Sequence, residues 1–156
     1  TASSEEKLRI AKDYGADFCI NYSSTDFKEK VKEITNKKGA DIIYDPVGGE
    51  VFEKSLRCIA WDGKLLVIGF ASGKIASAPT NLPLLKNCSI VGVFWGAWRE
   101  RDPSGHNKNM EILLDWWKQK KIRPHISKVY DIEDTKDALY ALMKREIIGK
   151  AVIKIK

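Results

Sequence analysis

The side chains that could serve as a nucleophile, a base or a metal ligand are few and scattered. His106 lies in a polar stretch and His125 follows a proline, and no motif places a serine or cysteine nucleophile beside either ring. The three cysteines, Cys19, Cys58 and Cys88, stand singly in apolar stretches without the two-residue spacing of a zinc or redox motif. We therefore expect packed or surface histidines and buried thiols in a reducing compartment, and we name no catalytic residue and no metal ligand.

A turn-forming segment, Asp45–Gly48, directly follows the apolar run Ile42–Tyr44 and is a candidate for ligand binding. In open α/β sheets, ligands bind outside the carboxyl ends of the strands. The alternative, that Asp45 only caps a turn or a helix, is equally well supported. Gly48-Gly49 opens a helical segment, but no G-x-G-x-x-G, the turn that holds a pyrophosphate, occurs in the 156 residues.

Short apolar segments alternate with amphipathic helices through the first part of the chain. The predicted strands are Phe18–Ile20, Asp41–Asp45, Lys64–Gly69 and Ser89–Phe94. The predicted helices are Ser4–Tyr14, Asp26–Thr35, Gly49–Ile59 and a short one that ends near Lys86. Because short helical crossovers require parallel strands, we predict a doubly wound α/β fold in which these four strands are parallel neighbours in one Rossmann-type sheet.

The sequence pattern changes after Trp95. We expect a polar turn over Gly96–Asn107 and a helix over Met110–Lys120. A final block consists of strands at Val129–Tyr130 and Ala151–Ile155 with a helix over Thr135–Lys144 between them. We predict a partial dinucleotide-binding domain over residues 1–124 and a C-terminal segment over 125–156 that belongs to a different sheet.

Composition argues against two classes of partner. The chain is 44% hydrophobic and 31% charged, which suits one soluble globular core. The net charge is +6, but lysines alternate with acids along Asp26–Lys38, so a solvated surface is favoured over a nucleic-acid face. The longest apolar run, Ile90–Trp98, falls short of the roughly 18 residues that span a bilayer. We therefore expect an intracellular protein, cytoplasmic or mitochondrial, that binds neither nucleic acid nor membrane.

Several short motifs, taken in order, resemble those of one superfamily. They are Thr1–Lys7, Gly15-Ala16-Asp17, Asn21-Tyr22, Asp45–Gly48, Gly63-Lys64, Ile68-Gly69-Phe70, Val91–Gly96 and Gly149-Lys150. Together they are similar to the medium-chain dehydrogenase/reductase superfamily, in its zinc-independent quinone oxidoreductase branch. The resemblance implies that a substrate domain, a first strand and a glycine loop precede Thr1, so that the domain is truncated at its N-terminus, and that residues 125–156 return to the substrate domain.

The same resemblance assigns an adenosine side to the cofactor site. It places Thr1-Ala2 at the end of the second strand, Ser3 and Ser4 towards the adenosine ribose, Lys7 one helical turn further on, and Tyr22 beside the same group. A carboxylate here would accept a hydrogen bond from a free 2′-hydroxyl and repel a 2′-phosphate. Hydroxyls, a lysine and a helix N-terminus instead favour NADPH over NADH.

Two observations weaken this assignment. Glu5 and Glu6 reduce the positive field of the helix start, and Ser3 and Ser4 could simply cap the helix while Lys7 is an ordinary surface lysine. The remaining residues that the resemblance assigns lie further along the chain. They are Asp45 and Val47 beside the adenine, Gly69 and Phe70 near the nicotinamide riboside, Val93, Phe94 and Trp95 on a strand passing the nicotinamide carboxamide, and Lys150 reaching back to the cofactor.

The resemblance implies an NADPH-dependent reductase of quinones or related α,β-unsaturated carbonyl compounds. Its partners would be a small electrophilic acceptor and, through a neighbouring strand, a second copy of the chain in a homodimer. Two alternatives are a zinc-dependent alcohol dehydrogenase of the same superfamily and a non-enzymatic nucleotide-sensing or RNA-binding module on the same fold.

Overall fold

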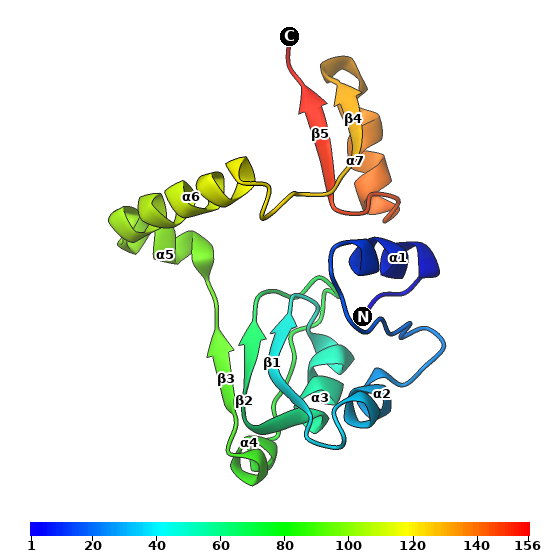
Figure 1. The fold of residues 1–156 in the computed structure, drawn as a ribbon, viewed down its shortest axis with the longest axis vertical. Coiled ribbons are helices and arrows are strands. Elements are labelled where there is room, and N and C mark those ends of the chain that lie inside the picture. The colour runs from blue at the N-terminus through cyan, green and yellow to red at the C-terminus, as the bar shows by residue number, and fades with distance from the viewer. The chain divides into compact units, whose positions relative to one another are not determined.

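A parallel sheet of three strands organises the first part of the chain in the computed structural model, which describes residues 1–156 (Figure 1). The strands are β1 (Ala40–Asp45), β2 (Ile59–Val67) and β3 (Ser89–Gly92), in the order β1-β2-β3. Asp45 pairs with Val67, and Val67 pairs with Gly92, so the three strands end at the same edge. The predicted parallel arrangement is confirmed for these strands.

Four helices belong to the same part of the chain: α1 (Glu5–Asp13), α2 (Phe27–Ile34), α3 (Gly49–Arg57) and α4 (Asn81–Lys86). Phe52 and Leu56 of α3 are buried in one core with Ile59 and Leu65 of β2, which places α3 against the sheet. Side chains alternate across a strand, and burial follows this alternation in β1, where Ile43 joins the core. Its two neighbours, Ile42 and Tyr44, are each 67% exposed.

Phe18–Ile20 does not form a strand of this sheet, so that prediction is wrong. The segment is held instead by a single parallel bridge between Ala2 and Asn21. The Ala2 amide donates to the Ile20 carbonyl oxygen, and the Tyr22 amide donates to the Ala2 carbonyl oxygen, each at 3.1 Å. Because Ala2 is its only ladder partner, the apolar run has no row of neighbours, and Phe18 is 64% exposed.

The junction of α3 and β2 also differs from the prediction of a helix through Ile59. The helix ends at Arg57, and Ile59 instead begins β2 opposite Ala40, whose amide donates to the Cys58 carbonyl oxygen at 2.9 Å. The register then shifts between Ala40 and Ile42, where β2 contains extra residues including Asp62 at φ +58°. Backbone pairing with β1 therefore outweighs the helical periodicity at this point.

The second part of the chain contains two helices where a turn was expected, so the prediction for Gly96–Asn107 is wrong. These are α5 (Trp95–Arg101) and α6 (Pro103–Lys118). Asp102 caps α6 by accepting a hydrogen bond from the Gly105 amide at 2.9 Å, and Pro103 occupies the first turn, where its missing N–H costs nothing. The Asp-Pro pair is a helix-start signal within this polar stretch.

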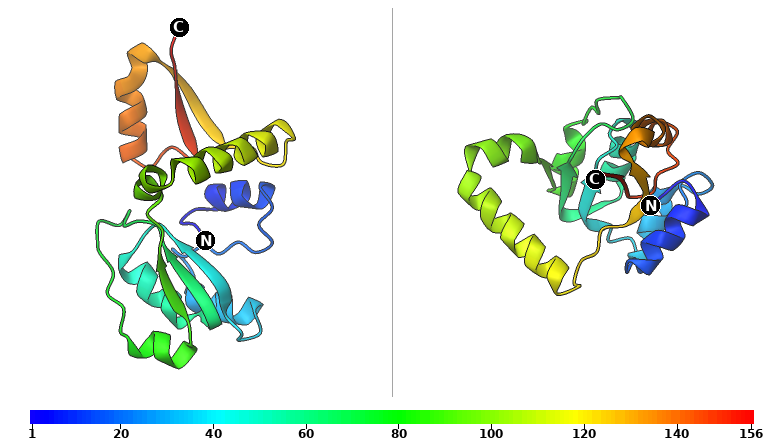
Figure 2. Two further views of the ribbon diagram at one scale, coloured as in Figure 1. Left: turned by 90° about the vertical axis from the view of Figure 1, so that its left-hand side faces the viewer. Right: turned by 90° about the horizontal axis from the view of Figure 1, so that it is seen from above.

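The chain ends in β4 (Ile126–Asp131), the short 3₁₀ helix η1 (Ile132–Asp134), α7 (Thr135–Met143) and β5 (Lys150–Lys154). Strands β4 and β5 lie in a sheet of their own, as predicted, and pair in parallel with each other, and α7 lies along this pair (Figures 1 and 2). Tyr130, Ala138 and Ala141 form its core.

The chain divides into two compact units, residues 1–96 and 97–156. The predicted boundary between residues 124 and 125 concerns membership of domains in a complete protein and stays a prediction. None of the helices combines the length and the apolar composition that crossing a bilayer requires.

The close approach of the β1 and β2 backbones makes Gly39 a testable position. Its φ is +90°, and a Cβ there would stand 2.7 Å from the Cys58 carbonyl oxygen. We expect Gly39→Ala to lower the free energy of unfolding by roughly 3 kcal/mol, because φ strain and a backbone collision add. Gly15→Ala is the matched control, since Gly15 has φ +97° but open space around it, and it should cost roughly 1 kcal/mol. Urea denaturation measures both, and equal losses would contradict the collision.

Candidate functional site

The carboxylate of Asp45 organises the turn that follows β1. Its side chain is only 3% exposed, and its Oδ1 accepts hydrogen bonds from the amides of Val47 at 2.8 Å and Gly48 at 3.0 Å. Its carbonyl oxygen accepts from the Ile68 amide at 2.9 Å, which ties the end of β1 to the end of β2. The turn-capping alternative therefore accounts for this buried acid, and its contact with a cofactor stays a prediction.

The loops that follow β1 and β2 pack against each other at the carboxyl edge of the sheet. The Val47 carbonyl oxygen accepts from the amide and the hydroxyl of Ser72, at 3.1 and 2.7 Å. A Cβ on Gly48 would stand 2.7 Å from the ring of Phe70, so this position requires glycine. Gly69 differs, because a Cβ there would make only an ordinary contact with the Pro46 carbonyl oxygen at 3.6 Å. No close protein neighbour explains this glycine.

The residues after β3 continue this edge. The Val93 amide donates to the Val67 carbonyl oxygen at 3.0 Å, so Val93 extends the pairing of β3 with β2. Phe94 is mostly exposed. The expectation that Trp95 also lies on the strand is wrong, because the chain turns there into α5. The structure thus places Val47, Phe70 and Phe94 after three strands that end together.

The predicted adenosine-side residues gather around the Ala2–Asn21 bridge. Ser4 is the N-cap of α1, and its Oγ accepts from the Lys7 amide at 3.4 Å. The Ser3 carbonyl oxygen accepts from the Ser23 hydroxyl at 3.1 Å, and Tyr22 lies between Ser23 and the bridge. Ser3 therefore adjoins the Tyr22 segment, and Ser4 and the half-buried Lys7 follow it at the start of α1. Ser23, which fastens the two segments together, was not singled out by the sequence analysis.

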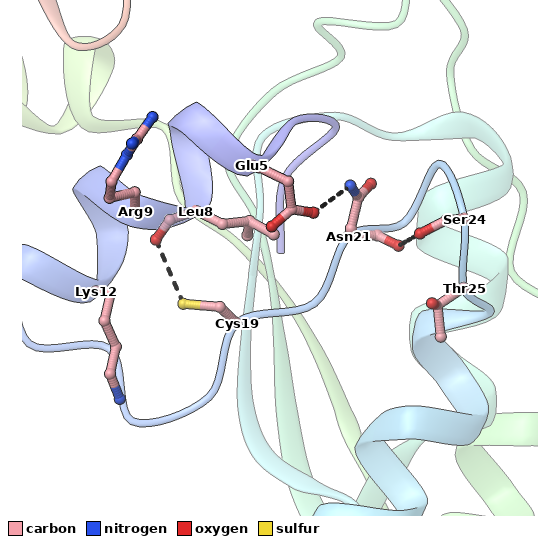
Figure 3. Close-up of a pocket in the computed structure, with 8 residues that line it drawn as sticks. All are labelled: Glu5, Leu8, Arg9, Lys12, Cys19, Asn21, Ser24 and Thr25. Atoms are coloured by element: carbon pink, nitrogen blue, oxygen red, sulfur yellow. Dashed lines mark hydrogen bonds between the residues drawn. The ribbon is translucent and has the colours of Figure 1, made fainter.

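Two of the three charged side chains at the start of α1, Glu5 and Lys7, point to different sides of the helix. Glu5 precedes Lys7 by two residues, which corresponds to about 200° around the helix axis. The Glu5 carboxylate accepts a hydrogen bond from Asn21 Nδ2 at 2.8 Å (Figure 3). One of the two acids in the first turn of α1 is therefore held by the segment that carries Tyr22.

A groove of about 590 Å³ lies between α1 and the chain that returns beside it (Figure 3). Its lining residues are Glu5, Leu8, Arg9, Lys12, Cys19, Asn21, Ser24 and Thr25. None of the predicted cofactor residues lines it, so the groove is distinct from the predicted site.

The cysteines differ in their surroundings. Cys19 Sγ donates to the Leu8 carbonyl oxygen at 3.5 Å, but the residue is exposed, so the prediction of a buried thiol is wrong for Cys19. Cys58 is buried, and burial raises the pKa of its thiol. Cys88 is half-buried.

The remaining candidates lie in the second unit. Lys150 begins β5, and its amide donates to the His125 carbonyl oxygen at 2.9 Å. The predicted contact between Lys150 and a cofactor stays a prediction. His106 lies in α6 with its ring edge-on to Trp98, at 6.5 Å between ring centres. Residues 1–156 contain no group of three or more His, Cys, Asp or Glu side chains placed to hold a metal ion.

Parallel strands with aligned carboxyl ends form the ligand-binding edge of an open α/β sheet, and comparisons with known proteins define the class. The sequence model of the zinc-binding dehydrogenase family matches residues 1–111. The chain is 40% identical over 156 residues to a quinone oxidoreductase-like protein 2 homolog of Nematostella vectensis, covering 99% of this chain and 43% of that protein. It is 45% identical over 160 residues to a 2-haloacrylate reductase of a Burkholderia species, covering 98% and 46%.

A solved structure gives the same class. The quinone oxidoreductase of Pseudomonas syringae pv. Tomato DC3000 matches with a TM-score of 0.85 and 25% identity, over 98% of this chain and 47% of that one. The chain therefore belongs to the zinc-binding dehydrogenase family, within the medium-chain dehydrogenase/reductase superfamily. It spans less than half the length of the relatives it matches.

The buried Asp45 carboxylate provides a test of the turn at the sheet edge. Asp45→Ala leaves the Val47 and Gly48 amides without their acceptor, so we expect a loss of roughly 2 kcal/mol in the free energy of unfolding. Asp45→Asn keeps an oxygen at the same place and should lose less than half as much. Chemical denaturation distinguishes the two variants. Equal losses would show that the negative charge, and not the acceptor geometry, matters here.

Proposed function

We propose that the complete protein is an NADPH-dependent oxidoreductase that transfers hydride to quinones or related α,β-unsaturated carbonyl compounds, with residues 1–96 supplying part of the cofactor site. The relatives named as a quinone oxidoreductase-like protein and as a reductase support the general class. Nothing in the chain's own geometry selects the acceptor, so the acceptor class follows from those relatives and from the motifs.

The observation that carries the cofactor proposal is the Ala2–Asn21 bridge. It brings the N-terminus of α1, with Ser3, Ser4 and Lys7, against the segment that bears Tyr22. Two hydroxyls, an ammonium group and first-turn amides are the donors that a phosphate dianion requires. One of the two first-turn acids that reduce their positive field, Glu5, is bonded to Asn21. These donors therefore fit a 2′-phosphate better than a free ribose hydroxyl.

The cofactor itself supplies the hydride, so the protein has to bind and orient it and exclude water. Val47, Phe70 and Val93 offer partly exposed apolar surface after three aligned strands, suited to the flat faces of a dinucleotide. The acceptor also takes up a proton after the hydride, and we assign no side chain of this chain as the donor of that proton. We further propose a homodimer, because β3 is an edge strand of the described sheet and all four of its residues are exposed.

A zinc-dependent alcohol dehydrogenase is the second candidate, favoured by the description of the matching family. It would require cysteine and histidine ligands outside residues 1–156. Measuring the zinc content of the purified complete protein separates the two candidates.

Lys7 is the residue whose charge tests the cofactor preference. In the complete protein, Lys7→Glu removes a charge-assisted contact and adds repulsion, so we expect the KM for NADPH to rise about tenfold or more while the KM for NADH changes little. Lys12→Glu is the matched control, because Lys12 carries the same charge on the same helix but donates to the Asp17 carbonyl oxygen on the groove side. Steady-state kinetics with both cofactors gives the answer. Equal effects of Lys7→Glu on the two cofactors would refute the assignment.

The 156-residue chain alone should bind NADPH weakly and show no catalysis. Its sequence has no G-x-G-x-x-G turn to hold the pyrophosphate, so the 2′-phosphate contacts at Ser3, Ser4, Lys7 and Tyr22 must overcome ion hydration and the ordering of the cofactor by themselves. Calorimetric titration of this chain with NADPH measures the affinity. A submicromolar dissociation constant would contradict our placement of the pyrophosphate site.

A further inference from the structure

We infer that Asn21 is a specificity-positioning residue, which keeps the Glu5 carboxylate away from the 2′-phosphate and so preserves the preference for NADPH. The inference rests on the proposed function and concerns the same site. It starts from the hydrogen bond of 2.8 Å between Asn21 Nδ2 and Glu5 Oε1, on the groove side of α1 (Figure 3).

The orientation of the Asn21 amide is fixed by a second hydrogen bond. Its Oδ1 accepts from the Ser23 amide at 3.1 Å, which leaves the two N–H groups of Nδ2 to face Glu5. The backbone of Asn21 is fixed as well, because its carbonyl oxygen accepts from the Thr25 amide at 3.0 Å. The Asn21 side chain is therefore held as a hydrogen-bond donor, and the Glu5 carboxylate is the acceptor of its hydrogen bond.

Without that donor, the Glu5 side chain has a competing position. Glu5 is the first residue of α1 and follows the capping Ser4 directly. The first turn of a helix attracts carboxylates through its unpaired amides and its dipole. A released Glu5 carboxylate would accept hydrogen bonds from the donors that the phosphate needs and would repel the phosphate by like charge.

In the observed arrangement Lys7 does not hold the Glu5 carboxylate, because the two side chains leave α1 on opposite sides. The contact that controls Glu5 thus comes from Asn21, which the bridge to Ala2 places one residue before Tyr22. A single segment of the chain would then do two things. It presents Tyr22 towards the phosphate position and holds the competing acid on the other side of the helix.

Asn21→Asp in the complete protein is the sharpest test. An aspartate keeps the acceptor for the Ser23 amide but loses the donor to Glu5 and repels it. We expect the KM for NADPH to rise by roughly fivefold or more, the effect of one water-screened charge at close range, while kcat and the KM for NADH stay near their original values. If Asn21 had a purely structural role, Asn21→Asp would instead weaken the binding of both cofactors.

Two double variants with the same net charge as the original protein provide the control. In Asn21→Asp with Glu5→Gln, the glutamine amide can donate to the aspartate, so the bond is restored with its polarity reversed and the NADPH preference should return to within about twofold. In Asn21→Asp with Glu6→Gln, the two carboxylates at positions 5 and 21 still face each other, so the preference should recover clearly less than in the first double variant.

Equal recovery in the two double variants would overturn the inference, because net charge alone would then explain the effect. An equal rise of the KM for NADPH and for NADH in Asn21→Asp would overturn it too, since Asn21 would then act only through the fold. If the original protein prefers NADPH and Asn21→Asp keeps that preference, the inference fails and the proposed function stands. If the original protein shows no preference for NADPH, both fail.

Discussion

Backbone pairing of β2 with β1 and β3 is the constraint on which the carboxyl edge of the sheet, and the predicted site residues after its strands, depend. Because Asp45, Val67 and Gly92 lie opposite one another, the loops that follow them start at one edge. The buried Asp45 carboxylate and the close packing of Gly48 on Phe70 then hold the first two loops together. The two loops at this edge are therefore held in place by hydrogen bonds and packing within the protein itself.

The adenosine side is held in a different and more local way. Two hydrogen bonds of the Ala2 backbone and one from the Ser23 hydroxyl to the Ser3 carbonyl oxygen join the helix start to the Tyr22 segment. These three hydrogen bonds make the two segments neighbours, although only a single bridge, and no continuous strand pairing, joins them. The Asn21–Glu5 bond holds one first-turn acid of α1 against the same segment. In the proposed function, the preference for a 2′-phosphate would depend on where this acid is held as well as on which cations are present.

The sequence predicts a strand correctly where a local apolar pattern coincides with neighbouring strands that can pair with it. Apolar runs of the right length predicted β1, β3 and the part of β2 from Lys64 to Val67, since each has a neighbour that completes its hydrogen bonds. Phe18–Ile20 is also apolar, but its only strand neighbour is Ala2, and no local sequence pattern indicates that a neighbouring strand is missing. The pair Asp102-Pro103 is a helix-capping signal that marks the start of α6. It lies in a polar stretch that was interpreted as a turn. The pairing of Glu5 with Asn21 joins residues 16 positions apart, so only the structure could show it.

The most direct test of the cofactor proposal is a crystal structure of the complete protein with bound NADP. We expect the 2′-phosphate to lie within hydrogen-bonding distance of the Ser3 and Ser4 hydroxyls, of Lys7 Nζ and of the Tyr22 hydroxyl, with Glu5 still bonded to Asn21. A 2′-phosphate held elsewhere on the protein, or one left in solvent away from these four residues, would contradict it.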